Sequence, residues 1–241
     1  MTFLLEARKL KRTGYLPAFL GAGIISCAFP VVNMLARSET FTSLPGDPFE
    51  ILMDANWQMM AMLNILISIC GACIMYHTEY ADNGIQKMDV LPVNPSHLFF
   101  SKALIANGVL AGVICFEMIA LTGCAAYWLP NVSVDFVSIL KTIGFQWLVS
   151  LPTVMLMLLI SSMCKNMWIS LGIGVILVFT FSIFPQENLV LSLFPFSSPY
   201  QTLAMAEENT HTILFCIVCV MQTVVFYLVE SLYVKVRRYC A

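Results

Sequence analysis

Residues 55–76 read ANWQMMAMLNILISICGACIMY and contain no charged side chain. A helix needs about 20 mostly apolar residues to cross the hydrocarbon core of a bilayer. The run is continuously apolar and does not show the alternation of a β-barrel strand. We therefore expect residues 55–76 to form a membrane-spanning helix.

Stretches of the same kind recur along the chain, at 15–35, 98–128, 137–163, 168–184 and 213–232. The stretch 98–128 is longer than one span needs, so we place its membrane-spanning part at 104–128 and its first turns at the membrane surface. Of the 241 residues, 59% are hydrophobic and 11% are charged, against about 25% charged in an ordinary soluble domain. The sequence predicts an all-α integral membrane protein, with six transmembrane helices in a single transmembrane domain over 1–241. This composition excludes a soluble globule, a disordered chain, a nucleic-acid-binding protein and a disulfide-stapled secreted fold.

The basic residues predict the orientation, because cytoplasmic loops carry an excess of lysine and arginine. One side of the predicted membrane holds Arg8, Lys9, Lys11, Arg12, Lys87, Lys102, Lys165, Lys235, Arg237 and Arg238. The other side holds Arg37 and Lys141. Both termini are therefore expected in the cytoplasm, as an even number of spans requires.

The outer side carries the opposite charge, from Glu39, Asp47, Glu50, Asp54, Asp135, Glu187, Glu207 and Glu208. An anionic face attracts cationic ligands. The alternative is that topology simply depletes basic residues outside.

Two outer segments are longer than a turn. Residues 36–54 contain Pro-Gly-Asp-Pro at 45–48 and are expected to be a turn-rich linker. In 185–212, the apolar run 189–196 is interrupted by prolines and is too short to span. We expect a re-entrant or interfacial segment between the fifth and sixth helices. The alternative is a lid packed on the outer ends of the helices.

The cytoplasmic stretch 77–97 contains a short amphipathic turn. Asp82 is a suitable N-cap, and Ile85 and Met88 lie on one face of a helix that Pro92 ends. Such a helix fits a groove on a cytoplasmic partner. The alternative is a connector that only joins two spans.

Three short segments around this turn, 79–84 (EYADNG), 91–93 (LPV) and 100–102 (FSK), resemble the intracellular loop of ABC-2 type permeases. The N-terminal segment 5–13 (LEARKLKRT) is similar to the elbow helix of the same family, which we expect over 1–13. His97 stands where an arginine or lysine is common in the family. The length and the six spans are most similar to the lantibiotic-immunity permeases, the MutE/EpiE or MutG kind.

The resemblance implies a non-catalytic membrane subunit of a bacterial plasma-membrane exporter that removes cationic antimicrobial peptides from the membrane. The chain contains no phosphate-binding Gly-x-x-x-x-Gly-Lys-Ser/Thr loop. ATP and Mg would bind a separate ABC ATP-binding subunit, expected in two copies, and a second six-span permease subunit would complete the complex within the membrane lipid. No cofactor is expected on this chain. The resemblance assigns the ATPase contact, as a coupling helix in the loop between the second and third spans, to Glu79, Asp82, Asn83, Gly84, Ile85 and Met88.

Glu117 is the acidic residue nearest the middle of a predicted span. Charged residues there usually face the bundle interior or water, because insertion of one costs about 2.5–3.5 kcal/mol. Glu117 is therefore expected either on a substrate path or subunit interface, or in a structural hydrogen bond.

His77, His97 and His211 fall on opposite sides of the membrane, and the cysteines of 70–73 lie inside a span. We expect no metal site and no catalytic residues.

Two other functions fit the sequence less well. An ABC-2 exporter of another drug or a lipid shares every feature above. A self-sufficient secondary transporter or channel would work without ATP. Such a protein is expected to have more than one buried ionisable residue along its transport path.

Overall fold

The computed structural model describes residues 2–11, 13–44, 46–81, 95–129, 135–184, 188–208 and 211–240. Within these residues the chain is helical throughout its regular structure, and five helices are long and apolar enough to cross a membrane. They are α2 (Tyr15–Thr42), α3 (Pro48–Tyr80), α5 (Pro95–Trp128), α6 (Phe136–Met163) and α10 (Thr212–Cys240). The expected class of protein, an all-helical integral membrane protein, is confirmed.

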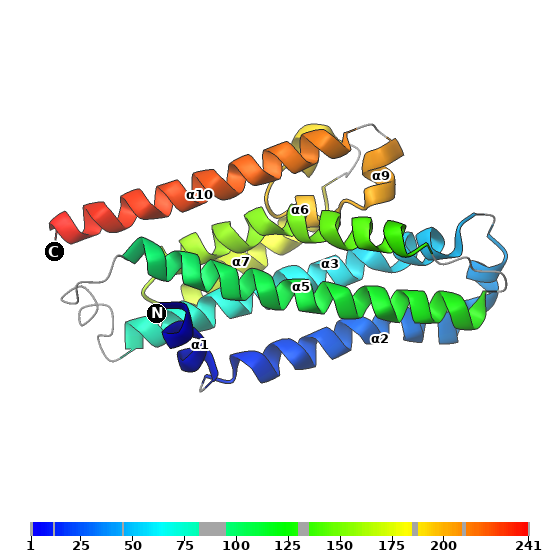
Figure 1. The fold of residues 1–241 in the computed structure, drawn as a ribbon, viewed down its shortest axis with the longest axis horizontal. Helices are drawn as coiled ribbons and strands as arrows, with labels where there is room; N and C mark the ends of the chain where they lie inside the picture. The colour runs from blue at the N-terminus through cyan, green and yellow to red at the C-terminus, as the bar shows by residue number, and fades with distance from the viewer. Residues whose placement is uncertain are drawn as a thin grey trace.

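The long helices run side by side along one axis, and α1 (Thr2–Lys11) lies across one end of the bundle (Figure 1). Both termini lie at this end, which we name the inner end because the basic residues predict that it is cytoplasmic. The opposite end is named the outer end. The assignment of the ends to the two sides of the membrane stays a prediction.

Helix α3 forms the centre of the bundle. Its most apolar window is 67% buried, whereas that of α10 is 11% buried. Helices α2, α5, α6 and α7 all pack against α3, while α10 packs chiefly on α6. Most of α10 therefore faces the surroundings of the bundle, and in Figure 1 it runs along one side.

The expected fifth span corresponds to α7 (Met167–Ser182). Its 16 residues give a helix of about 24 Å, less than the roughly 30 Å of a bilayer core. Asn166 begins it by accepting a hydrogen bond from the backbone amide of Trp168 (2.9 Å). The total of six spans stays a prediction.

Helix α7 packs closely on α3 at Gly174, which has no side chain to hold the helices apart. A Cβ at this position would lie 2.7 Å from Cγ2 of Ile69 on α3. Cys73 on α3 adds a contact of 3.2 Å between its sulfur and the hydroxyl of Ser170 on α7. The short helix is thus held by the centre of the bundle.

The expectation of a turn-rich linker over 36–54 is wrong for both of its ends. Helix α2 continues to Thr42, with its backbone leaving helical geometry at Arg37 (φ −141°). Helix α3 already begins at Pro48, because Asp47 accepts a hydrogen bond from the Phe49 amide (2.8 Å) and proline suits a first helical position. Only residues 43–47 separate the two helices.

The outer segment contains α8 (Leu189–Ser192), η2 (Ser198–Tyr200) and α9 (Leu203–Glu208). Its backbone carbonyls accept hydrogen bonds from side chains of the long helices. Trp57 of α3 donates to the carbonyl of Pro199 (2.9 Å), and Gln222 of α10 donates to that of Leu193 (2.8 Å).

This segment reaches the middle of α6, where the hydroxyl of Ser198 donates to the carbonyl of Val149 (2.8 Å). Ser197, Ser198 and Phe196 are buried. Non-helical backbone at membrane depth is tolerated where protein surrounds it and satisfies its polar groups. Residues 196–198 of the segment are inserted between the helices, whereas α9 lies at their outer ends. The choice between a re-entrant or interfacial segment and a lid stays a prediction.

Candidate functional site

Four charged side chains from three helices meet at the inner end of the bundle. We name this group, Glu6 and Lys9 of α1, Glu79 of α3 and Lys102 of α5, the inner charge cluster. The ammonium group of Lys102 donates to one carboxylate oxygen of Glu6 and lies 2.8 Å from Oε1 of Glu79. Lys9 lies 2.6 Å from the other oxygen of Glu6 and 3.9 Å from Oε1 of Glu79.

The cluster is largely removed from solvent. The side chains of Glu6 and Lys102 are each 2% exposed and that of Glu79 is 8% exposed, while Lys9 is 39% exposed. A buried charge is tolerated when it is paired and hydrogen-bonded. Lys102 meets this condition by donating a hydrogen bond to Glu6 and forming an ion pair with Glu79. Its nitrogen also lies 5.6 Å from the centroid of the Tyr76 ring.

The charges of the cluster support one another electrostatically. Burial alone would raise the pKa of Glu6, but the neighbouring ammonium groups of Lys102 and Lys9 outweigh it and hold that pKa below its ordinary value. Glu6 is therefore a carboxylate at neutral pH and remains a partner for both lysines.

Helix α10 adds a third buried carboxylate, Glu230, near this cluster. Its charged neighbours are Arg237, two turns further along α10, and Glu79. Its oxygen Oε2 has no hydrogen-bond partner within the described part of the chain. Helices α3, α5 and α10 thus each contribute a charged residue to the inner end.

The cluster connects α1 to the helices on either side of residues 82–94. Glu79 lies in the last turn of α3, before these residues, and Lys102 lies near the start of α5, after them. The ends of α3 and α5 are thus tied to α1 and to each other.

Of the predicted ATPase contacts, Glu79 lies in the cluster, with its carboxylate turned toward Lys102. Asp82, Asn83, Gly84, Ile85 and Met88 lie outside the described residues. The contact with an ATPase stays a prediction for all of them.

Glu6, Lys9 and Lys102 are not predicted as one group from the sequence. The sequence feature that could have indicated the group is Lys102, a lone cation in a stretch that is otherwise uncharged from 98 to 116. A lysine that is buried there would pair with a carboxylate or a backbone carbonyl.

Glu117 lies in the middle of α5 and is completely buried. Its carboxylate accepts hydrogen bonds from the hydroxyl of Ser26 on α2 and from the amide of Asn64 on α3 (2.8 Å). The residue thus connects three helices of this chain. This geometry suits the structural hydrogen bond, while a role on a substrate path or subunit interface stays a prediction.

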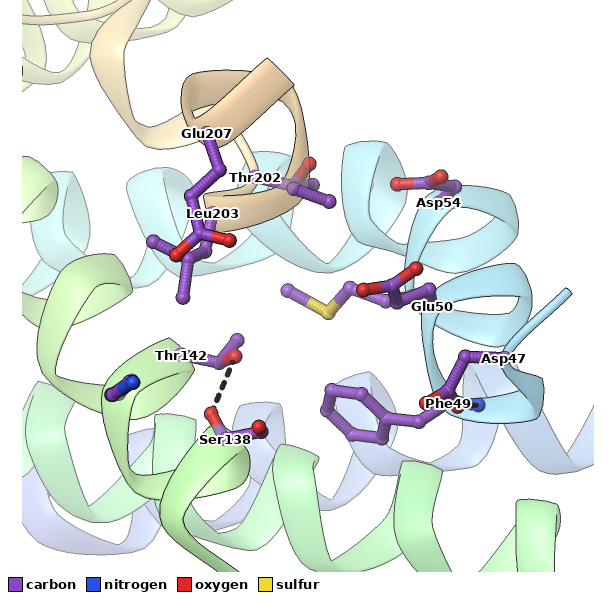
Figure 2. Close-up of a pocket in the computed structure, with 12 residues that line it drawn as sticks. Asp47, Phe49, Glu50, Asp54, Ser138, Thr142, Thr202, Leu203 and Glu207 are labelled. Carbon is purple, nitrogen blue, oxygen red and sulfur yellow. Dashed lines mark hydrogen bonds between the residues drawn. The ribbon is translucent and has the colours of Figure 1, made fainter. Parts of the chain in front are cut away.

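An acidic pocket of about 160 Å³ opens at the outer end, between the starts of α3 and α6 and helix α9. Figure 2 shows Glu207 of α9 on one side of it and Glu50 and Asp54 of α3 on the other. Asp47 and Lys141 also line the pocket, so four carboxyl groups face one ammonium group.

Fixed charges of one sign in a cavity concentrate counter-charges there. Among the residues of known placement, no group of three or more His, Cys, Asp or Glu side chains is arranged to hold a metal ion.

Comparison with models of protein families matches residues 2–181 to a model described as "ABC-2 family transporter protein". The matched part contains the inner charge cluster and Glu117. Neither the curated proteins nor the solved structures include a match to the chain.

Proposed function

Since the chain belongs to the ABC-2 family of transporter proteins, we propose that it is the non-catalytic membrane subunit of an ATP-driven exporter that removes cationic antimicrobial peptides from a bacterial plasma membrane. Membership of the family indicates a multi-pass membrane subunit of an ABC exporter, and in general an ABC ATP-binding partner. ATP and Mg would bind that partner, expected in two copies. A second six-span permease subunit would complete the complex.

The observation that carries this proposal is the bridge that Lys102 makes between Glu6 and Glu79. The ATPase would dock on the coupling helix expected within 82–94. Closure of two ATPase subunits on ATP would displace the loop, and the inner charge cluster would pass this displacement to α1, α3 and α5 as one body. Rigid-body rocking of such a unit switches a transporter between inward and outward access.

Purification of the tagged chain from its native membrane in mild detergent, with mass spectrometry of the partners, tests the ATPase interaction. We expect an ABC ATP-binding subunit and a second six-span protein. Met88→Asp should reduce recovery of the ATPase, whereas Lys141→Glu at the outer end should leave it unchanged. Recovery of the chain alone, as a homo-oligomer, would contradict the proposal and favour a secondary transporter or channel.

The acidic pocket supports a cationic substrate, and the resemblance to lantibiotic-immunity permeases supports a peptide. If the pocket receives cationic groups, replacing Glu50 and Glu207 by glutamine should lower the protection of cells against a cationic lantibiotic several-fold. The same variant should leave assembly with the ATPase unchanged. Unchanged protection would contradict a role of the pocket and favour export of another drug or a lipid.

A further inference from the structure

A second pocket, of about 400 Å³, lies between α5, α6 and α10. We name it the lateral pocket. Its walls include Phe100 and Leu104 of α5, Trp147 and Met155 of α6, and Thr223 and Tyr227 of α10. It lies apart from the inner charge cluster, Glu117 and the acidic pocket, and the proposed function makes no use of it.

The mouth of the lateral pocket opens on the outside of the helix bundle, where we expect the hydrocarbon of the bilayer. Helix α10, which forms one wall, is the least buried of the membrane-length helices. Phe100, Leu104 and Val224 line the pocket and are each about half exposed. In a membrane, the molecules that surround such a surface are lipid acyl chains, which match its almost entirely apolar walls.

The inner end of the pocket lies between two aromatic rings. Phe100 of α5 and Tyr227 of α10 are level with each other, with ring centroids 6.3 Å apart. On α5, His97 lies one turn before Phe100 and on the same face as Phe100 and Leu104, and it is exposed. The pocket wall thus continues toward the inner end into a side chain that can donate a hydrogen bond.

Lys235 supplies a positive charge nearer the inner end than His97. It follows Tyr227 by eight residues on α10, which is about 12 Å nearer the inner end. It is exposed, and no ion pair is found for it among the described residues. Basic groups between transmembrane helices at a membrane surface attract anionic lipid headgroups.

We propose that the lateral pocket binds one acyl chain of an anionic phospholipid from the leaflet at the inner end, with the phosphate of that lipid against His97 and Lys235. The apolar walls select the chain, and the two side chains at the mouth select the charge of the headgroup.

Quenching of tryptophan fluorescence by brominated lipids tests this proposal, because Trp147 lines the pocket and is 37% exposed. The full-length chain in detergent is titrated with phosphatidylglycerol brominated on its acyl chains. We expect a saturable component of quenching at about one lipid per chain. This component should be lost in Trp147→Phe and kept in Trp168→Phe. Trp168 lies on α7, is 71% exposed and is expected to contact bulk lipid or detergent outside the pocket.

A pocket-filling variant provides the second readout. Thr223→Leu adds bulk at the pocket wall and should weaken the saturable component about tenfold. Thr180→Leu on α7 is the matched control, because both threonine hydroxyls donate to the carbonyl four residues earlier at 2.8 Å. Thermal unfolding of each variant checks that the fold is kept.

The headgroup is tested by replacing brominated phosphatidylglycerol with brominated phosphatidylcholine, which should bind several-fold more weakly. His97→Asn combined with Lys235→Gln should remove this difference, whereas Lys165→Gln at the same end should not.

Three results would overturn the proposal. They are quenching that appears only with excess lipid, a saturable component that survives Trp147→Phe, and equal affinity for the two lipids in the unmodified chain. Shielding of Trp147 by a co-purifying second copy or other permease chain would also overturn it. That result would indicate that a helix of the second chain occupies the pocket.

Discussion

Lys102 shows how far a single residue can be interpreted from sequence. It stands alone in an otherwise uncharged stretch, where it either reaches water at the membrane surface or pairs with a buried partner of opposite charge. The identity of that partner was not accessible, because Glu6 lies 96 residues away on a helix that packs across the end of the bundle. The sequence shows that the charge of Lys102 is isolated along the chain. Only the fold shows which carboxylates pair with it.

Replacement of Lys102 by methionine should be severely destabilising. It leaves the carboxylates of Glu6 and Glu79 buried near each other, and breaking a buried ion pair by removing one partner costs about 3–5 kcal/mol. Thermal unfolding in detergent, followed by tryptophan fluorescence, measures this loss. The triple variant with Glu6→Gln and Glu79→Gln should recover a large part of it, and no recovery would contradict the pairing.

The lowered pKa of Glu6 predicts a pH dependence of stability. A carboxyl group whose pKa is lowered on folding contributes stability at pH values above its unfolded pKa. This contribution is lost as the pH falls below the ordinary value of 4.5 toward the lower folded pKa. Between pH 5 and 3 the unfolding temperature of the unmodified chain should therefore fall more steeply than that of Glu6→Gln. Parallel curves would show that Glu6 gains no charge stabilisation on folding.

Two substitutions of Glu117 distinguish its role as a hydrogen-bond acceptor from a role of its negative charge. Glutamine keeps an acceptor for Ser26 or Asn64, so Glu117→Gln should retain assembly and transport. Glu117→Leu leaves both donors buried without a partner and should cost about 1–3 kcal/mol. Loss of transport in a stably folded Glu117→Gln chain would instead place the carboxylate on the substrate path.

At the scale of helices, hydropathy predicts where helices form but not how they pair. The apolar stretch of α7 was evident from sequence, yet its close packing on α3 depends on Gly174 meeting Ile69. Gly172, two residues earlier, has open space around it. Both glycines look alike in the sequence, because small residues in a span are common for many reasons.

This difference gives a matched pair of substitutions. Gly172→Ala should be neutral or slightly stabilising, since alanine is favoured over glycine in a helix by up to about 1 kcal/mol. Gly174→Ala forces Ile69 to move and should destabilise by about 1–3 kcal/mol. Comparison of the two unfolding temperatures measures the effect, and equal values would show that α7 can shift on α3 without loss.

At the scale of the whole molecule, composition was enough to predict an all-helical membrane protein, and the family of the chain was evident from short segments near its N-terminus and first cytoplasmic loop. The path of the outer segment could not be predicted from the sequence, because its prolines and apolar residues fit a lid as well as an insertion between the helices. Contacts with Trp57, Val149 and Gln222, on three different helices, determine its depth.

Those contacts also constrain the order in which the protein can be assembled during synthesis. The outer segment precedes α10 in the chain, yet the carbonyl of Leu193 receives its hydrogen bond from Gln222 of α10. Independent insertion of the helices is followed by their association within the membrane. The carbonyl of Leu193 can receive this hydrogen bond only after α10 has been inserted, so the outer segment reaches its described contacts later than the helices that precede it.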